Sequence, residues 1–455
     1  MQGTIVGAAT RIPTRNGSRP YINFDNAAST PPLVPVMEIV NSFVPWYSSV
    51  HRGNGLKSRL STAAYEQARE VVGRFVRANP KEHVVIFGKN TTEAINKLAW
   101  RLRLHKKDIV LISNLEHHSN DLPWRARATV RRIRTDESGR ISPAHFTQLL
   151  KRYNDRVKLV ALSGASNVTG HMADIHWFAA QTHKAGAQIL VDCAQLAAHR
   201  PIDIKSLEDP EHLDYIAFSA HKMYAPFGTG ALIGRRDTFD RGVPEYSGGG
   251  TIESVTTKTV DWARPPESEE AGSSNVIGAV AMARAAQTLE QIGMKAIASH
   301  EMKLLTYALA KLKKIPGLRL YGDPNIATAT RTAVIPFTVT GVPSHLVAAV
   351  LGFEYGIGVR SGCFCAQPYV MSLLGLDNAA AQRVRASILH RRRDLTPGMV
   401  RVSFGLYNTT EEIDALAEAL QAIARQDFDS YLLNKTTGQY TPANTKDDFS
   451  AYFRL

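Results

Sequence analysis

Cysteines, long apolar runs and acidic residues are all scarce in this sequence, and the first two scarcities exclude whole classes of protein. Its 455 residues include only three cysteines, which argues against a disulfide framework and favours a reducing compartment. No apolar run approaches the ~18 residues that a membrane span needs. Residues 1–20 carry three arginines but lack the apolar stretch of a secretory signal. We therefore expect a cytoplasmic protein with no membrane partner.

The cysteine spacing also disfavours a metal site. Cys363 and Cys365 are separated by one residue, and Cys193 lies far from both. Zinc-binding pairs are usually separated by two to four residues and come with a second ligand pair, which this sequence lacks at matching spacing. We expect no bound metal.

Acidic residues are outnumbered, with 41 Asp and Glu against 54 Lys and Arg, for a formal charge of +13. The excess is spread widely, with small clusters at residues 125–134 and 390–393. No nucleic-acid motif accompanies these clusters. A solvated basic surface that attracts anionic small molecules is the better interpretation, and we expect no nucleic-acid partner.

What the chain does contain is alternation between short apolar strands and helical stretches. Hydrophobic residues make up 44% of the chain, enough for a large core and two domains. Continuously apolar strands between helices are typical of a parallel-type sheet covered on both faces, and ligands bind at the carboxyl ends of such strands. The strands are expected at residues 84–87, 109–112, 158–162, 188–191, 215–218 and 231–233, and the helices at 63–76, 92–102 and 175–184.

The pattern changes after the glycines at 248–250. Helices at 276–289 and 303–313 precede strands at 332–337 and 400–403, and the tail from residue 427 has only a weak pattern. A last helix at 411–424 follows Thr409 and Glu412, which have the spacing of a capping box. We predict a large α/β domain at 20–290 and a smaller α+β domain formed by 1–19 and 291–455.

Lys222 ends the segment Ser219-Ala220-His221-Lys222, directly after a predicted buried strand. A single lysine is usually a surface residue. At the end of a strand in an α/β sheet, however, desolvation and neighbouring charge lower its pKa and allow it to form an imine. The surrounding residues favour this second interpretation, in which Lys222 holds pyridoxal phosphate (PLP) as a Schiff base.

Two other strand ends carry side chains that suit PLP. Asp192 could pair with the pyridinium nitrogen and keep it protonated, although it could also be a turn or capping residue. Gln195, three residues on, could contact the phenolic oxygen of the ring. Thr91 and Thr92 open a predicted helix, where N–H groups and hydroxyls form an anion site suited to the phosphate. Plain N-capping explains these threonines equally well.

Three further residues have a functional and an ordinary interpretation. His117 could stack on the cofactor ring and move protons, or the histidine pair it belongs to could lie in an ordinary loop or a metal site. Cys365, on a glycine-bounded loop five residues after Arg360, could be a thiolate nucleophile or an inert buried cysteine. Arg401, on a late strand, could fork onto a substrate carboxylate or form a surface salt bridge.

Ten short blocks, taken together and in this order, resemble the class V aminotransferase superfamily, with most likeness to group II cysteine desulfurases and selenocysteine lyases. An ordered set across residues 20–425 is far more specific than any one motif. The blocks are FDNAAS (24–29), HRG (51–53), TTE (91–93), EHH (116–118), SNV (166–168), DCAQ (192–195), SAHK (219–222), GGGT (248–251), AGS (271–273) and RSGCFCAQP (360–368).

The resemblance implies a fold and a set of residue roles. The fold is that of the PLP-dependent aspartate aminotransferases (fold type I), and the family is dimeric, which implies a homodimer. Lys222 is similar to the Schiff-base lysine, Asp192 to the pyridinium partner and Cys365 to the persulfide-forming cysteine. The other implied residues are His117, Asn167 and Gln195 around the ring, Thr91, Thr92, Ser219 and His221 at the phosphate, Ser273 reaching the phosphate from the partner subunit, and Arg401, Arg360, Asn26 and Ala28 around the substrate.

The implied reaction converts L-cysteine to L-alanine and leaves a persulfide on Cys365, from which an acceptor protein takes the sulfur. Two features depart from the desulfurase pattern. Cys363 gives a Cys-x-Cys loop, and the segment 369–399 is longer than the family loop and contains Arg391-Arg392-Arg393. Two alternatives therefore stay open: another class V PLP reaction, such as transamination, epimerisation or β-elimination, and a non-catalytic protein that kept the fold.

Overall fold

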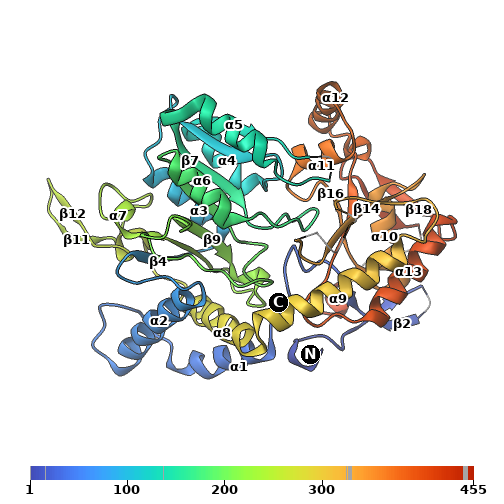
Figure 1. Cartoon of the computed structure of the whole chain (residues 1–455). Helices are drawn as coiled ribbons and strands as arrows, with labels where there is room; N and C mark the ends of the chain where they lie inside the picture. The colour runs from blue at the N-terminus through green and yellow to red at the C-terminus, as the bar shows by residue number, and fades with distance from the viewer. Residues whose placement is uncertain (1, 16, 137, 324, 326–329, 444–448) are drawn as a thin grey trace.

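A seven-stranded mixed sheet forms the centre of the protein in the computed structural model, which describes residues 2–15, 17–136, 138–323, 325, 330–443 and 449–455 (Figure 1). Strands β5 to β9 are mutually parallel, and β10 runs antiparallel to both of its neighbours. The prediction of an α/β fold is confirmed. In sheet order the strands are β4 (His83–Gly88), β10 (Gly230–Arg235), β9 (Tyr215–Ser219), β8 (Gln188–Asp192), β7 (Val157–Ser163), β5 (Ile109–Ser113) and β6 (Thr129–Ile133).

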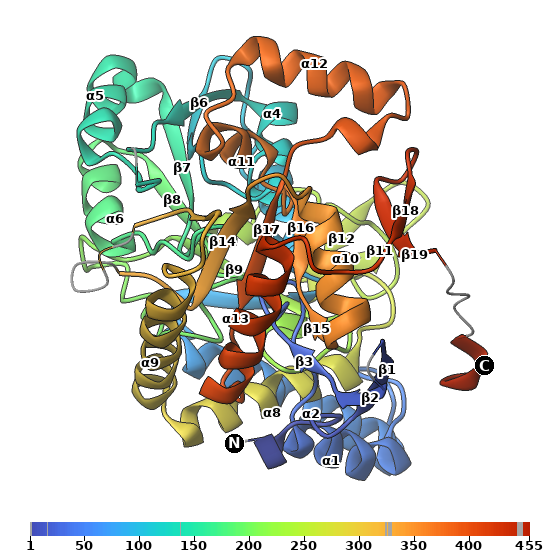
Figure 2. The same ribbon diagram turned by 90° about the vertical axis from the view of Figure 1, so that its right-hand side faces the viewer.

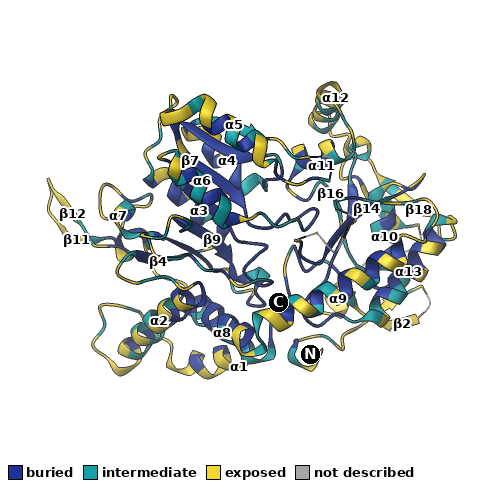
Figure 3. Ribbon diagram, viewed as in Figure 1, coloured by how far each residue is buried: buried dark blue, intermediate teal, exposed yellow. Residues whose placement is uncertain are grey.

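Two hydrophobic clusters cover the faces of this sheet. One face packs on α3 and α4, with Trp124 fully buried, and the other packs on α1, α2, α5, α6 and α8. Figure 3 shows the strands buried and the outer helix faces exposed. The helices are α1 (Val34–Phe43), α2 (Leu56–Phe75), α3 (Thr91–Arg101), α4 (Leu122–Arg127), α5 (Pro143–Tyr153), α6 (Ile175–Lys184), α7 (Arg236–Phe239) and α8 (Val276–Ile292).

A second, four-stranded sheet follows in the chain and has its own core. Its order is β13 (Leu318–Leu320), β14 (Val334–Val339), β17 (Met399–Ser403) and β16 (Arg360–Gly362), all antiparallel. The helices of this core are α9 (Met294–Leu312), α10 (Ser344–Tyr355) and α13 (Thr410–Ala424) (Figure 2). The predicted capping box of Thr409 and Glu412 is present at the start of α13.

The N-terminal segment joins this second part. Strand β3 (Ile22–Asn23) pairs in parallel with β15 (Ile357–Gly358), and Phe24 belongs to the second core. The remaining strands form small hairpins: β1 (Arg11–Thr14) with β2 (Gly17–Pro20), β11 (Ile252–Val255) with β12 (Val260–Trp262), and β18 (Tyr431–Asn434) with β19 (Gln439–Pro442).

The structure departs from the sequence prediction in four places. Strand β10 is antiparallel because only residues 220–229 separate it from β9, too few for a crossover. Strand β6, which the sequence pattern does not predict, lies within the basic cluster at 125–134. Helix α2 begins seven residues earlier than the predicted helix at 63–76. The long segment at 369–399 forms two helices, α11 (Gln367–Leu373) and α12 (Asn378–Leu389).

Among the described residues, no helix is both long and apolar enough to span a membrane.

Candidate active site

A cavity of about 510 Å³ lies where the carboxyl ends of β7, β8 and β9, the first turn of α3 and the loop after β16 meet. Ligands bind at this position in open α/β sheets, and the volume is within the ordinary range for a small-molecule site. The predicted residues that line it are Ala28, Thr91, Thr92, His117, Asn167, Asp192, Gln195, Ser219, His221, Lys222, Arg360, Cys365 and Arg401.

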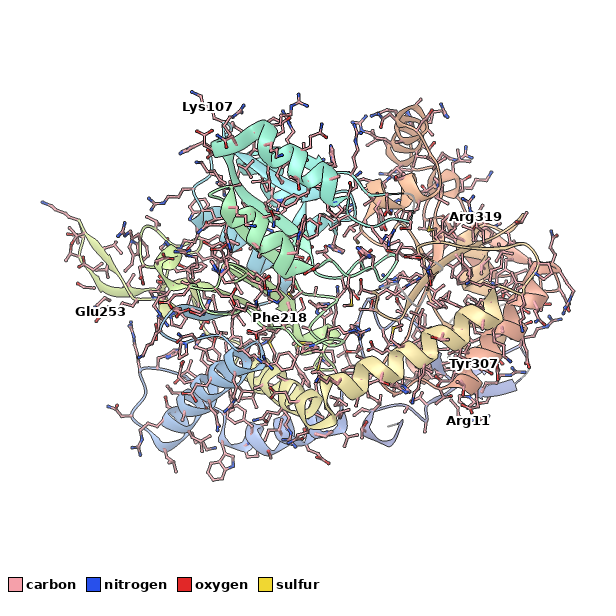
Figure 4. All side chains as sticks on the ribbon, in the orientation of Figure 1. Arg11, Lys107, Phe218, Glu253, Tyr307 and Arg319 are labelled. Carbon is pink, nitrogen blue, oxygen red and sulfur yellow. The ribbon has the colours of Figure 1, made fainter. Side chains whose placement is uncertain are left out.

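Lys222 reaches the cavity from the end of β9. The strand is buried along its whole length, and Phe218 lies in the interior of the protein (Figure 4). Burial lowers the pKa of Lys222, while Asp192 acts in the opposite direction. A lysine with a lowered pKa has a larger neutral fraction, which is the nucleophilic form.

Asp192 ends β8 beside Lys222 and is 5% exposed. Its Oδ1 accepts a hydrogen bond of 2.9 Å from the Ala194 backbone N–H, and burial raises the pKa of its carboxyl group. The Gln195 side chain is oriented by a 2.6 Å hydrogen bond from Nε2 to the carbonyl of Ala27. These contacts fix a carboxylate and an amide on one wall of the cavity.

The first turn of α3 and the end of β9 form a group of hydroxyls at one end of the cavity. Asn90 caps α3, and the Thr91 backbone N–H donates to Ser219 Oγ at 2.8 Å. The Thr91 and Ser219 hydroxyls are 2.6 Å apart, and Thr92 Oγ1 lies 2.7 Å from Ser119 Oγ. Hydroxyls at the positive end of an α-helix suit an anion.

His117 is held by the loop that follows β5. Its Nδ1 accepts a hydrogen bond from the Ser119 backbone N–H at 3.1 Å and lies 3.0 Å from Ser119 Oγ. Burial and the nearby Lys222 charge lower the pKa of His117 to about 4. The imidazole is therefore neutral at physiological pH, and the hydrogen bond to Nδ1 assigns its proton to Nε2.

Arg401 is held in the opposite wall by two partners. One guanidinium nitrogen donates to the Asn167 carbonyl and another to Asp25 Oδ1, each at 2.9 Å. Its Nε is buried without a hydrogen-bond partner among the described residues, and the guanidinium lies over the Phe364 ring at 5.0 Å. Arg360 shares the same Asp25 through a 3.2 Å contact. The site thus has excess positive charge, as expected for binding a carboxylate.

The two loop cysteines have different surroundings. Cys365 is exposed and lines the cavity, close enough to Lys222 and Arg401 to favour the charged forms of both. The Cys363 thiol donates to the Pro397 carbonyl at 3.4 Å and lines a separate cavity. Burial raises the pKa of Cys363 to about 11. A thiol with so high a pKa is a poor nucleophile at neutral pH.

Two predicted site residues lie outside the cavity. Asn26 is buried, and its amide bonds to the carbonyls of Asn23 and Ser403 at 3.0 Å each. Ser273 is exposed and lines another cavity, beside Glu269.

Sequence reasoning missed two groups that organise the site. Asp25 joins Arg401 to Arg360. Glu116, next to His117 in the chain, is buried and accepts hydrogen bonds from Ser163 and Asn120 at 2.7 Å each. Both lie within the FDNAAS and EHH blocks. Their position beside an assigned residue was the available signal.

One cluster outside the cavity has metal-ligating residue types. His183, His212 and Asp214 bring their ligand atoms within 4.8 Å of one another. The two imidazole rings are stacked 4.0 Å apart at 16°. An ion cannot lie in both of two nearly parallel ring planes, so this arrangement does not suit metal coordination.

Comparison with known proteins assigns the family. The family model described as aminotransferase class-V matches residues 22–416. The chain belongs to this family. Class V aminotransferases are PLP-dependent enzymes, and the arrangement of Lys222 and Asp192 around one cavity agrees with that chemistry.

The curated relatives of this class V chain include proteins named as desulfurases. A probable cysteine desulfurase from Mycobacterium leprae is 36% identical over 90% of the chain, and the chain spans only 63% of that relative's length. A cysteine desulfurase from Haloferax volcanii is 34% identical, with 90% of each protein covered. An apo cysteine desulfurase structure from Thermococcus onnurineus NA1 has 31% identity and a TM-score of 0.78, covering 89% of this chain and 95% of that one. The fold type I prediction is thereby confirmed.

Proposed function

We propose that this protein is a PLP-dependent cysteine desulfurase that converts L-cysteine to L-alanine and holds the released sulfur as a persulfide on Cys365. One observation carries the proposal. The exposed Cys365 lines the same cavity as Lys222 and Asp192. A sulfur nucleophile and an imine-forming lysine therefore face one bound substrate. The relatives from M. leprae and H. volcanii, which are named as a probable cysteine desulfurase and a cysteine desulfurase, support this activity.

The residues of the cavity fit PLP. Lys222 would hold its carbonyl carbon, Asp192 its ring nitrogen, and the hydroxyls of Thr92 and Ser219 its phosphate. The neutral His117 would lie against its ring. When bound, PLP supplies an electron sink for charge that develops at the substrate Cα.

The chain's own residues then have separate tasks. Arg401 and Arg360 bind the substrate carboxylate and so orient Cα toward Lys222. Lys222 takes the Cα proton, and its lowered pKa leaves more of the side chain in the neutral form that can act as a base. Asp192 keeps the ring nitrogen protonated.

Cys365 completes the reaction as the nucleophile. Its thiolate attacks the substrate sulfur, so that a new S–S bond forms while the Cβ–S bond breaks. The bonding electrons remain with the carbon fragment, which takes up protons and leaves as alanine. The neutral His117, with its proton on Nε2, is suited to donate a hydrogen bond from Nε2 rather than to release a proton.

A homodimer belongs to the same proposal. Ser273 lies in a second cavity of the same chain and follows Gly272, whose backbone N–H donates to the carbonyl of the exposed Gly249 at 2.7 Å. We infer that it serves the phosphate site of a partner subunit, since it is exposed and does not reach the cavity of its own chain. A protein that is monomeric in solution with full cofactor content would contradict this assignment.

The test combines product analysis with mass spectrometry. PLP-loaded protein is incubated with cysteine and other amino acids, and alanine, sulfide and keto acids are quantified. We expect alanine from cysteine, and a +32 Da shift, the mass of one sulfur atom, on the loop peptide. Cys365→Ala should lose both, while Cys363→Ser, the matched control, should keep most activity. If Cys365→Ala forms alanine normally, the protein catalyses another class V reaction.

A further inference from the structure

Helix α12 packs against the rest of the protein through one half-buried face, which includes Ala381, Val384 and Ile388. All twelve of its residues, Asn378–Leu389, are described, and none is buried. Figure 2 shows it lying across the top of the molecule, above α4 and α11. A helix of this length is only marginally stable in water by itself. Because this face is only half-buried, part of the apolar surface of the helix remains available to a partner.

The space beside α12 is a groove of about 1070 Å³. One side is formed by α12, and the other by α4 and α11. Its apolar residues include Leu122 and Leu389, which are 53% and 66% exposed. Twelve helical residues span about 18 Å, so a partner helix of about three turns could lie along α12. The other apolar lining residues are Met371, Leu376, Ala381 and Ile388.

The groove adjoins the persulfide loop. His118 lines the groove, and its backbone N–H donates to the Cys365 carbonyl at 2.7 Å. The Gln367 backbone N–H in turn donates to His118 Nε2 at 3.3 Å. A molecule held in the groove would therefore lie next to Cys365, which is the residue that must release its sulfur.

The charge around the α12 groove indicates which kind of partner would bind there. Residues 377–393 contain five arginines and one acidic residue, Asp377. Arg383, Arg385, Arg391 and Arg393 form no ion pair with any residue that the structure describes. Of these, Arg385 lines the groove itself, and Arg125 lines its α4 side. An apolar floor with a basic rim fits a helix with one leucine-rich and one acidic face. Nucleic acid would use the arginines but leave the leucines uncovered.

We propose that the α12 groove docks an acidic amphipathic helix of a partner protein whose cysteine receives the sulfur from Cys365. The proposal rests on the desulfurase function. The partner's thiolate attacks the outer sulfur of the Cys365 persulfide, and a new S–S bond forms on the partner. The old S–S bond breaks, and its electron pair stays on the Cys365 sulfur, so no external oxidant or reductant is needed.

The test uses two synthetic helical peptides and the full-length PLP-loaded protein. Both peptides carry leucines on one face and one terminal cysteine; the other face carries glutamates in one and glutamines in the other. Binding of S-alkylated peptide is followed by fluorescence anisotropy, and sulfur transfer to free peptide by the +32 Da shift. Alanine formation with dithiothreitol as acceptor measures the catalytic reaction separately. The variants are Arg385→Glu and Leu389→Glu, with the exposed Lys151→Glu as a charge-matched control.

We expect the glutamate peptide to bind and accept sulfur about tenfold better than the glutamine peptide, with the difference shrinking at high salt. Arg385→Glu and Leu389→Glu should each reduce binding and transfer about tenfold, with alanine formation unchanged, and Lys151→Glu should change neither. Equal behaviour of the two peptides, or of the variants and wild type, overturns the proposal.

Two other occupants would also overturn it. One is indicated if a single-stranded RNA oligonucleotide binds in an Arg385-dependent manner and displaces the glutamate peptide. The other is indicated if Leu389→Glu splits a dimer into monomers without affecting peptide binding. If wild type binds the glutamate peptide but never forms alanine from cysteine, the desulfurase function fails while the docking surface stands.

Discussion

Replacing Glu116 with glutamine should make the stability of this protein less dependent on pH. Glu116 is 3% exposed, and burial raises the pKa of its carboxyl group from 4.5 to about 7. Hydrogen bonds from Ser113, Ser163 and Asn120 lower this pKa without cancelling the effect of burial. Glutamine has nearly the same shape and cannot ionise, so it isolates the contribution of the charge.

The size and sign of the effect follow from proton linkage. Below pH 4.5 the carboxyl is protonated in both the folded and the unfolded chain, so its ionisation costs nothing. Above pH 4.5 the unfolded chain releases the proton first, and wild-type stability falls until the folded carboxyl ionises near pH 7. At about 1.36 kcal/mol per pKa unit, the rise from 4.5 to about 7 corresponds to about 3.4 kcal/mol.

The assay is urea denaturation of wild type and Glu116→Gln from pH 4.5 to pH 8. The free energy of unfolding of the variant, minus that of wild type, should rise by about 3 kcal/mol across this range and level off toward pH 8. His117, His171 and His221, whose pKa values burial lowers to about 4, destabilise both proteins as pH falls below 6.5 and cancel in the difference. A difference that does not change with pH would refute the buried, proton-linked carboxyl.

Four further substitutions test the site and the fold. Lys222→Ala should abolish the pyridoxyl label that borohydride fixes on the protein, as read by peptide mapping; a label on another lysine would remove Lys222 from its role. Asp192→Asn should retain PLP by absorbance but lower kcat about a hundredfold or more, and near-normal kinetics would make Asp192 structural. Arg401→Lys should raise KM for cysteine more than it lowers kcat, because a point charge replaces a planar fork; equal effects on both would contradict carboxylate binding. Thr409→Ala should cost about 1 kcal/mol in chemical denaturation through loss of the α13 cap, with activity unchanged.

The regular core of the fold could be predicted from sequence because its signals are local. Strands β5, β8 and β9 are continuous apolar runs, and their predicted bounds agree with the structure within one residue at each end. Strand β6 carries arginines at 131 and 132, so its sequence pattern indicates a charge cluster and not a strand, since an edge strand needs no apolar run. The hairpin of β18 and β19 depends on pairing within a polar tail, where alternation is weak.

The sequence predicts those site residues that lie at the ends of neighbouring strands, but not the contacts between distant segments. Lys222 and Asp192 end neighbouring parallel strands, so topology alone brings them to the same edge. Asp25 lies more than 300 residues from Arg401 in sequence, and no local pattern indicates that contact. Burial of a single side chain is equally hard to predict from sequence. The pKa of Glu116 is raised because β5 and β7 pack around its carboxyl group, and no local sequence pattern indicates that packing.

The Cys-x-Cys loop shows how backbone conformation can separate two similar thiols. Phe364 and Cys365 have φ values of +52° and +54°, in the left-handed region that non-glycine residues seldom occupy. The Phe364 ring lies against Arg401, and its carbonyl accepts a 2.7 Å hydrogen bond from Asn167; both contacts help to hold this conformation. The turn exposes Cys365 to the cavity and leaves Cys363 bonded to Pro397 behind it. The turn therefore decides which thiol faces the cavity, and a second cysteine in the motif does not by itself place a second thiol there.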